Sequence, residues 1–155
     1  GVAPKDAVSA AGRLRQHAAQ TLPSARLDGV LVCEQVGDGV EVIVGVTHKP
    51  PFGATVMVGL GGVLSELLGD VRFLVTPFTR DDAERAVRAL RGFPLLDGFR
   101  GRPPADVDAL VGMLMAVQRL ALAAGESLRE LDLNPVAVRP RGLGAVALDA
   151  LVVAR

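Results

Sequence analysis

The stretch "ELDLNPVAVRPRGLGAVALDA", residues 130–150, places acidic and amide side chains in an otherwise apolar setting. Its first half alternates apolar and polar residues, which predicts a strand. Because side chains alternate along a strand, Glu130, Asp132 and Asn134 would share one face. Asp149 lies at the far end, inside a second apolar run. This pattern predicts a β-hairpin that brings amide and carboxylate oxygens together.

A tight turn with Arg141 and Gly142 at its centre would place Asn134 directly opposite Asp149, because both are then equally far from the turn. Directly opposed residues have Cβ atoms about 4.5–5.5 Å apart. At that separation an amide oxygen and a carboxylate can share one cation, with Asp132 as a second carboxylate or an outer-shell partner. All these ligands are oxygens, which favours Mg²⁺ or Mn²⁺ over zinc.

The alternative interpretation is that these are solvent-facing strand residues and that Asp149 is a charge at the sheet edge. A register shift of one residue would move Asp149 to the other face, and Gly144 makes such a shift possible. The register of the hairpin therefore decides between a metal site and a solvated strand.

The rest of the chain predicts an α+β fold with a mostly antiparallel sheet packed with helices. Apolar residues at helical spacing and N-cap signals predict helices, and β-rich runs between Gly/Pro turns predict strands. The expected helices span residues 4–22, 79–90 and 105–124, the second with Thr79 as its N-cap. The expected strands span residues 29–36, 39–47, 54–60 and 71–78, followed by the hairpin.

Composition narrows the class of protein. The chain has 155 residues, half of them hydrophobic, enough for the core of one domain. Its 17 basic and 17 acidic residues balance, so neither nucleic acid nor an anionic membrane is expected as a partner. Cys33 is the single cysteine, and the apolar segments predict no membrane span. Without a signal-peptide pattern we expect a cytoplasmic protein, and the abrupt start at "GVAPKDA" predicts a piece of a larger one.

Several motifs occur in a recognisable order. Asn134 of "LDLNP" precedes the aspartate of "ALDA" by fifteen residues. Upstream stand "GVLVCEQV", "GVEVIVGV", "PFGATVMVGLGGVLSELLGDV" and "LLDGFRGRPP". This combination resembles the ATP-grasp domain of NDP-forming acyl-CoA synthetases, relatives of the succinyl-CoA synthetase β subunit. The resemblance covers nearly the whole chain and implies that residues 1–155 form the carboxy-terminal part of such a domain, with an ATP-grasp-type lobe as its fold.

The resemblance also assigns roles to residues. It implies that Asn134 and Asp149 bind the Mg²⁺ that bridges nucleotide phosphates. These are the two residues that the predicted register of the hairpin places opposite each other. Glu34 matches a position at the adenine and ribose side of the nucleotide, with Gly37 in the hinge that follows. Glu41 matches a second carboxylate of that region. The glycine run at 59–63 either lets the backbone approach a ligand or forms a simple turn.

The implied activity is that of a ligase that binds ATP or ADP with magnesium. Acyl-CoA, NDP and phosphate would be converted to acid, CoA and NTP through a phosphohistidine. The implied partner is a CoA-binding, phosphohistidine-carrying domain of the same or another chain. We expect residues 1–155 alone to be inactive, because the phosphate-binding lysine and the histidine of the family's preceding lobe are not in this sequence.

Some positions depart from the family pattern. In "HKPPFGA" the chain has Lys49 and Ala54 where the family usually has other residues. It has Leu74 where members commonly carry arginine, although Arg72 is close by. These departures favour the alternative function, a degenerate ATP-grasp-like regulatory or interaction module, beside an acyltransferase domain for example, that does no chemistry.

Overall fold

The computed structural model describes residues 1–49, 51–62 and 69–155. The chain divides into two units, Gly1–Gly37 and Asp38–Arg155. The second unit carries the predicted hairpin.

The first unit is a helix followed by an irregular segment. A 3-10 turn, η1 (Pro4–Asp6), leads into α1 (Ala7–Thr21), which confirms the helix predicted over residues 4–22. The strand predicted over residues 29–36 is wrong, because among the described residues this segment pairs with no strand. A β-rich sequence becomes a strand only when a neighbour takes up its backbone hydrogen bonds, and a lone strand is not stable in water.

The second unit is built on a six-stranded sheet in which all the pairs that form it are antiparallel. The strand order is β3-β2-β1-β4-β5, and β6 also pairs with β4. The strands are β1 (Val40–Lys49), β2 (Gly53–Leu60), β3 (Val71–Val75), β4 (Leu128–Val138), β5 (Ala145–Ala147) and β6 (Ala150–Ala154). The α+β class and the mostly antiparallel sheet are thereby confirmed.

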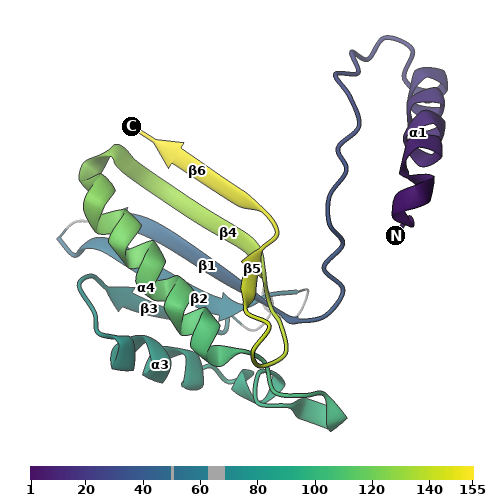
Figure 1. Cartoon of the computed structure of the whole chain (residues 1–155). Helices are drawn as coiled ribbons and strands as arrows, with labels where there is room; N and C mark the ends of the chain where they lie inside the picture. The colour runs from purple at the N-terminus through teal and green to yellow at the C-terminus, as the bar shows by residue number, and fades with distance from the viewer. Residues whose placement is uncertain (50, 63–68) are drawn as a thin grey trace. The chain divides into compact units, whose positions relative to one another are not determined.

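Alternation along the strands gives the sheet one apolar face. Val42, Val44 and Val46 of β1 are fully buried. They pack under α3 (Arg80–Arg88) and α4 (Val107–Ala124), which lie across this face of the sheet (Figure 1). This helix-covered face is the core of the second unit.

The opposite face is called the open face here. It carries Phe73 and Val75 of β3, which are 61% and 49% exposed. Among the described residues of the second unit, no helix packs on it. Polar side chains on this face can therefore meet a ligand or another part of a protein.

The two α-helices described in the second unit, α3 and α4, begin at side-chain caps. Thr79 and Asp82 form a capping box at the start of α3, which confirms the predicted N-cap. Asp106 caps α4 by accepting a hydrogen bond from the N–H of Ala109 at 3.1 Å. The buried stripe of α4 consists of Leu110, Val111, Leu114, Val117, Gln118 and Ala121. Short 3-10 turns lie at Phe93–Leu95 (η2), Phe99–Gly101 (η3) and Gly125–Ser127 (η4).

The expectation that no segment could span a membrane needs correction. Residues Val107–Ser127, which include α4, are long and apolar enough by length and composition, with a mean hydropathy of 1.6. The sequence reasoning overlooked how few charges interrupt this helix. Its buried stripe packs on the sheet, as expected of the core helix of a folded domain.

Candidate metal and nucleotide site

The turn between β4 and β5 has the predicted centre. The N–H of Arg139 donates to the carbonyl of Gly144 at 3.0 Å, and the N–H of Leu143 donates to the carbonyl of Pro140 at 2.9 Å. Arg141 and Gly142 therefore form the tip. The backbone of Gly142 has a φ of 84°, a left-handed conformation that glycine adopts without steric cost.

The register that follows from this turn places Asn134 and Asp149 opposite each other, as predicted. Leu133 pairs with Ala150, and Val136 pairs with Ala147. Between these pairs, the N–H of Asn134 donates to the carbonyl of Asp149 at 3.3 Å. Both residues are exposed. The Oδ1 of Asp149 accepts from the N–H of Ala150 at 2.8 Å, which holds the carboxylate beside the backbone of β6.

Asp132 lies on the open face of β4. It pairs with Gly45 of β1, which in turn pairs with Met57 of β2. Glycine has no side chain to cover the neighbouring carboxylate. A shallow groove of about 280 Å³ lies here, lined by Asp132, Asn134, Glu130, Met57, Phe73 and five further residues of β1 and β4.

The donor set fits a hard divalent cation. Asn134, Asp149 and Asp132 offer only oxygen atoms, the ligand type of Mg²⁺. Within the part of the chain that the structure describes, no three His, Cys, Asp or Glu side chains gather as a metal cluster. Two carboxylates and one amide suit a Mg²⁺ ion that keeps its remaining positions for phosphate oxygens and water.

Glu41 is the second residue of β1 and lies beside Gly61 of the glycine run. Its carbonyl accepts a hydrogen bond from the N–H of Gly61 at 2.7 Å. A Cβ added at Gly61 would lie 2.9 Å from the carbonyl carbon of Glu41, so this position needs glycine. Gly61 therefore serves close packing of backbone on backbone. Val63, the last residue of the run at 59–63, lies outside the described residues.

A family model for the ATP-grasp domain matches residues 2–154. The chain belongs to the ATP-grasp domain family.

Curated relatives of this ATP-grasp chain are acid–CoA ligases. The β subunit of an ADP-forming acetate–CoA ligase (II) of Pyrococcus furiosus is 41% identical over 90% of this chain and 59% of its own length. An ADP-forming acetate–CoA ligase (I) of Archaeoglobus fulgidus is 45% identical over 81% of this chain and 18% of its own length. The chain thus spans only part of each of these relatives.

Solved structures agree with the family. One is the acetyl-coenzyme A synthetase 1 of Ca. Korarchaeum cryptofilum with coenzyme A, acetyl-coenzyme A and a phosphorylated phosphohistidine segment. It is 37% identical, with a TM-score of 0.84 over 99% of this chain and 67% of that chain. The same protein with coenzyme A and Mg-AMPPCP is 41% identical, with a TM-score of 0.72 over 77% of this chain and 55% of that chain. At these identities the match supports both fold and family.

The three predicted nucleotide residues of this ATP-grasp chain fall in different units. Glu34 and Gly37 belong to the first unit, and Glu41 belongs to the second. Within the first unit, Glu34 lines a largely apolar groove of about 630 Å³ between α1 and residues 30–35. Their assignment to the nucleotide stays a prediction.

The departure at Leu74 lies away from the open face. Leu74 pairs with the fully buried Val56 and packs against the core beneath the helices. Arg72 lies on the same face, where its guanidinium donates to the carbonyl of Ala89 at the end of α3 and pairs with Asp70 at 3.7 Å. Neither side chain lies on the face that carries Asp132. Of the other departures, Ala54 is buried, and the side chain of Lys49 lies outside the described residues.

Sequence reasoning missed two carboxylates that hold this unit together. Asp70 is 4% exposed and accepts from the N–H groups of Arg91 at 3.0 Å and Gly92 at 2.9 Å. Burial acts to raise its pKa, but these N–H groups and Arg72 outweigh burial and hold the pKa below its usual value. No local pattern in the sequence indicates these contacts.

Asp106 is the second of these carboxylates. The N–H groups of Gly144 and Ala109 are the chief causes that lower its pKa. An aspartate just before an amphipathic helix is a usual N-cap signal, so its contact with Ala109 was predictable. Its contacts with the hairpin were not, because they join residues far apart in the sequence.

Proposed function

We propose that this chain is the ATP- and Mg²⁺-binding part of an NDP-forming acyl-CoA synthetase. The observation that carries the proposal is the opposition of Asn134 and Asp149 on an exposed hairpin, within a chain whose relatives are ADP-forming acid–CoA ligases. The first relative is matched over 59% of its length, so the activity of the complete protein belongs to the proposal.

The chain's residues would act by binding and orientation. Asn134 on β4 and Asp149 between β5 and β6 would hold the cation, and Asp132 would supply a further carboxylate or orient water. A bound Mg²⁺ neutralises charge on the phosphates during phosphoryl transfer. Glu34 and Glu41, as acceptors, would bind ribose hydroxyls or the base, with Gly37 as the hinge.

The partners follow from the same proposal. The nucleotide would be ATP or ADP, and the phosphoryl group would pass to a histidine on a CoA-binding domain of the same or a partner chain. A solved relative with 37% identity carries a phosphorylated phosphohistidine segment together with coenzyme A, which supports this partner. The protein would work in the cytoplasm, as a unit of a larger enzyme that contains residues 1–155.

The alternative is a degenerate ATP-grasp-like module that binds or regulates without chemistry. The motif "HKPPFGA", which departs from the family pattern at Lys49 and Ala54, favours this alternative. Leu74 is weak support for it, because this residue packs against the core. A leucine in place of arginine at this position removes no side chain from the open face.

An activity assay on the full-length protein distinguishes the two functions. The protein would be supplied with acetyl-CoA, ADP, phosphate and Mg²⁺, and ATP formation would be measured together with phosphohistidine labelling from ATP. We expect both signals, and we expect both to be abolished by EDTA and by a combined substitution of Asn134 and Asp149 with alanine. Nucleotide binding without labelling or turnover, tested with several acyl-CoA substrates, would establish the degenerate module instead.

A further inference from the structure

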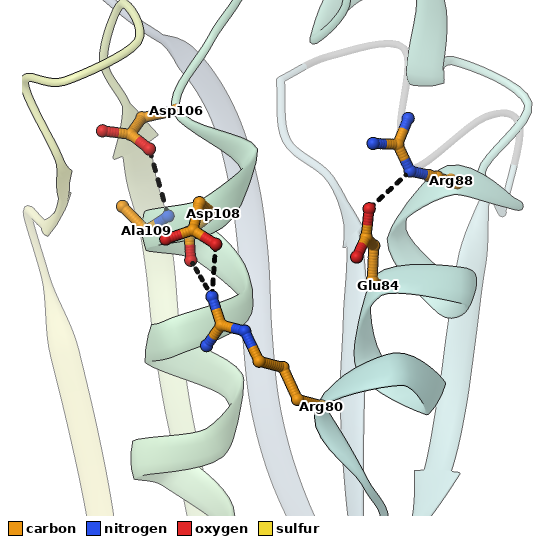
Figure 2. Close-up of polar contacts among 6 residues, drawn as sticks. All are labelled: Arg80, Glu84, Arg88, Asp106, Asp108 and Ala109. Atoms are coloured by element: carbon orange, nitrogen blue, oxygen red, sulfur yellow. Dashed lines mark hydrogen bonds and ion pairs between the residues drawn. The ribbon is translucent and has the colours of Figure 1, made fainter.

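Asp106 joins the start of α4 to the tip of the hairpin. Its Oδ1 accepts from the N–H of Ala109 at 3.1 Å, the contact drawn in Figure 2. Its Oδ2 accepts from the N–H of Gly142 at 2.9 Å and from the N–H of Gly144 at 3.0 Å. One carboxylate therefore binds three backbone donors, and two of them belong to the turn between β4 and β5.

The backbone around Asp106 strengthens this connection. The N–H of Asp106 donates to the carbonyl of Arg139 at 2.7 Å, and the N–H of Arg141 donates to the carbonyl of Pro104 at 2.9 Å. Residues 104–106 therefore hold both sides of the turn. Gly142 and Gly144 each have a φ of 84°, which orients their N–H groups toward the same carboxylate oxygen.

Asp149 lies between β5 and β6, and little else fixes the register of these two strands. β6 is an edge strand, and within the second unit none of its residues is buried. β5 has only three residues, and none of these is buried either. Backbone hydrogen bonds form equally well in neighbouring registers, so a strand that buries no apolar face is only weakly specified by its own sequence.

We propose that Asp106 is a positioning residue of the metal site. By holding the N–H groups of Gly142 and Gly144, its carboxylate fixes the hairpin turn and thereby the register that puts Asp149 opposite Asn134. A shift of one residue would turn Asp149 to the other face of the sheet. This inference rests on the proposed function, in which Asn134 and Asp149 bind the cation.

Asp106→Ser separates this role from helix capping. Serine is about as good an N-cap as aspartate, so α4 keeps its first hydrogen bond. The shorter side chain has a single oxygen and cannot also reach the turn. Asp106→Asn is the second variant: it has one acceptor oxygen in place of two, and its NH₂ group repels the N–H groups that remain.

Asp108→Asn is the matched control. Asp108 lies in the same first turn of α4, is exposed, and pairs with Arg80 of α3 (Figure 2). Among the described residues, none of its hydrogen bonds or ion pairs joins the hairpin. Removing its charge tests whether any loss of an acid at this end of α4 has the same effect.

Two measurements on the full-length protein test the proposal. Hydrogen exchange, read on peptides covering residues 132–136 and 145–150, reports the amides of Asn134 and Leu148, which bond to Asp149 and Pro135. Paramagnetic resonance reports Mn²⁺ affinity in the presence of ATP. We expect Asp106→Ser and Asp106→Asn to speed exchange in both peptides and to weaken Mn²⁺ binding about tenfold, the usual effect of losing an orienting partner. Asp108→Asn should change neither.

The outcomes are distinguishable. Asp149→Asn is titrated with Mn²⁺ in parallel. If Asp149→Asn weakens Mn²⁺ binding and the Asp106 variants do not, Asp106 is not a positioning residue, and the proposed function stands. Unchanged exchange in both hairpin peptides overturns the inference in the same way. If Asp149→Asn itself leaves Mn²⁺ affinity unchanged, the metal site of the proposed function fails, and the inference fails with it.

Discussion

The main-chain N–H of Asn134 donates to the carbonyl oxygen of Asp149 at 3.3 Å, so these two residues face each other across the last hairpin. One brings an amide and the other a carboxylate, and both are exposed. In an ATP-grasp chain this pair is the strongest candidate to hold a divalent cation between protein and phosphates.

Asp149→Asn should weaken cation binding while the fold survives. The substitution keeps the size and shape of the side chain but removes one negative charge from the proposed Mg²⁺ site. Phosphoryl transfer depends on this cation to neutralise the charge of the phosphates. We expect Mn²⁺ affinity and ATP-dependent histidine phosphorylation in the full-length protein to fall at least about tenfold. The melting temperature without metal should barely move, since exposed substitutions usually change stability by within about 0.5 kcal/mol.

Glu126→Gln is the control for this loss of charge. Glu126 is exposed in η4 and forms only a distant pair with Arg155, at 3.7 Å. It should leave cation affinity unchanged. Phosphorylation at the parent rate by the Asp149 variant under limiting Mg²⁺ would mean that Asp149 is not a ligand, and would favour the degenerate module.

The hairpin was predictable because local residues suggest where the turn lies, and counting from an assumed turn gives the register. Counting from a turn centred on Arg141 and Gly142 gives the pairs from Val138 with Ala145 to Glu130 with Val153, so alternation and counting were enough to oppose Asn134 and Asp149. The segment 29–36 has equally strong β propensity but is not a strand in the structure. The β propensity of a segment depends on its own residues, whereas strand formation also requires a neighbouring strand to pair with.

The contacts that hold the hairpin in place were not predictable from local patterns. Asp106 reaches residues more than thirty positions away, and Asp70 reaches the loop after α3 in the same manner. An acid in a sequence looks the same whether it is solvated or bound to distant N–H groups. Only the packing of α4 against the sheet brings Asp106 beside the turn.

Gln118→Leu should destabilise the second unit. Gln118 is 5% exposed, and its side chain accepts from the N–H of Phe78 at 2.6 Å and donates to the carbonyl of Phe78 at 3.1 Å. Leucine fills similar space but leaves both backbone groups without these partners. Each unsatisfied buried group costs about 1–3 kcal/mol, so we expect a loss of at least that size in urea unfolding.

The neighbouring position on α4 provides the control for Gln118. Arg119 is exposed, so Arg119→Leu should change the free energy of unfolding by within about 0.5 kcal/mol. Equal stability of the two variants would show that the bonds to Phe78 contribute nothing net.

Leu74→Arg should destabilise the chain and should not improve nucleotide binding. Leu74 packs against the core opposite Val56, on the face it shares with Arg72. An arginine there would desolvate a charge beside another guanidinium, at a cost of roughly 1–3 kcal/mol. Val75→Arg, on the open face of the same strand, is the control and should cost little. Tighter ATP binding by Leu74→Arg would instead indicate that this position faces the ligand.

Acid should weaken the second unit through Asp70 and Asp106. Both carboxyls have pKa values below the ordinary 3.8: for Asp70, burial opposes the shift and the N–H groups of Arg91 and Gly92 outweigh it, and for Asp106 the N–H of Gly144 contributes most. A pKa lowered by folding means that the ionised form stabilises the native state. That stabilisation is fully present above the unfolded-state pKa and is lost as pH falls from about 3.8 through the lowered native values.

Asp70→Asn tests this sign directly. At neutral pH the variant should lose about 1–3 kcal/mol, because a neutral amide replaces a charged acceptor of two hydrogen bonds. It no longer titrates at this position, so the difference in unfolding free energy between parent and variant should stay constant from pH 7 to about pH 5. The difference should then shrink as the pH falls below 3.8, where the parent's own carboxyl takes up a proton. Urea unfolding at half-unit steps between pH 3 and pH 7 measures it, and a difference that grows toward low pH would mean that the Asp70 carboxyl is protonated more readily in the folded chain than in the unfolded one.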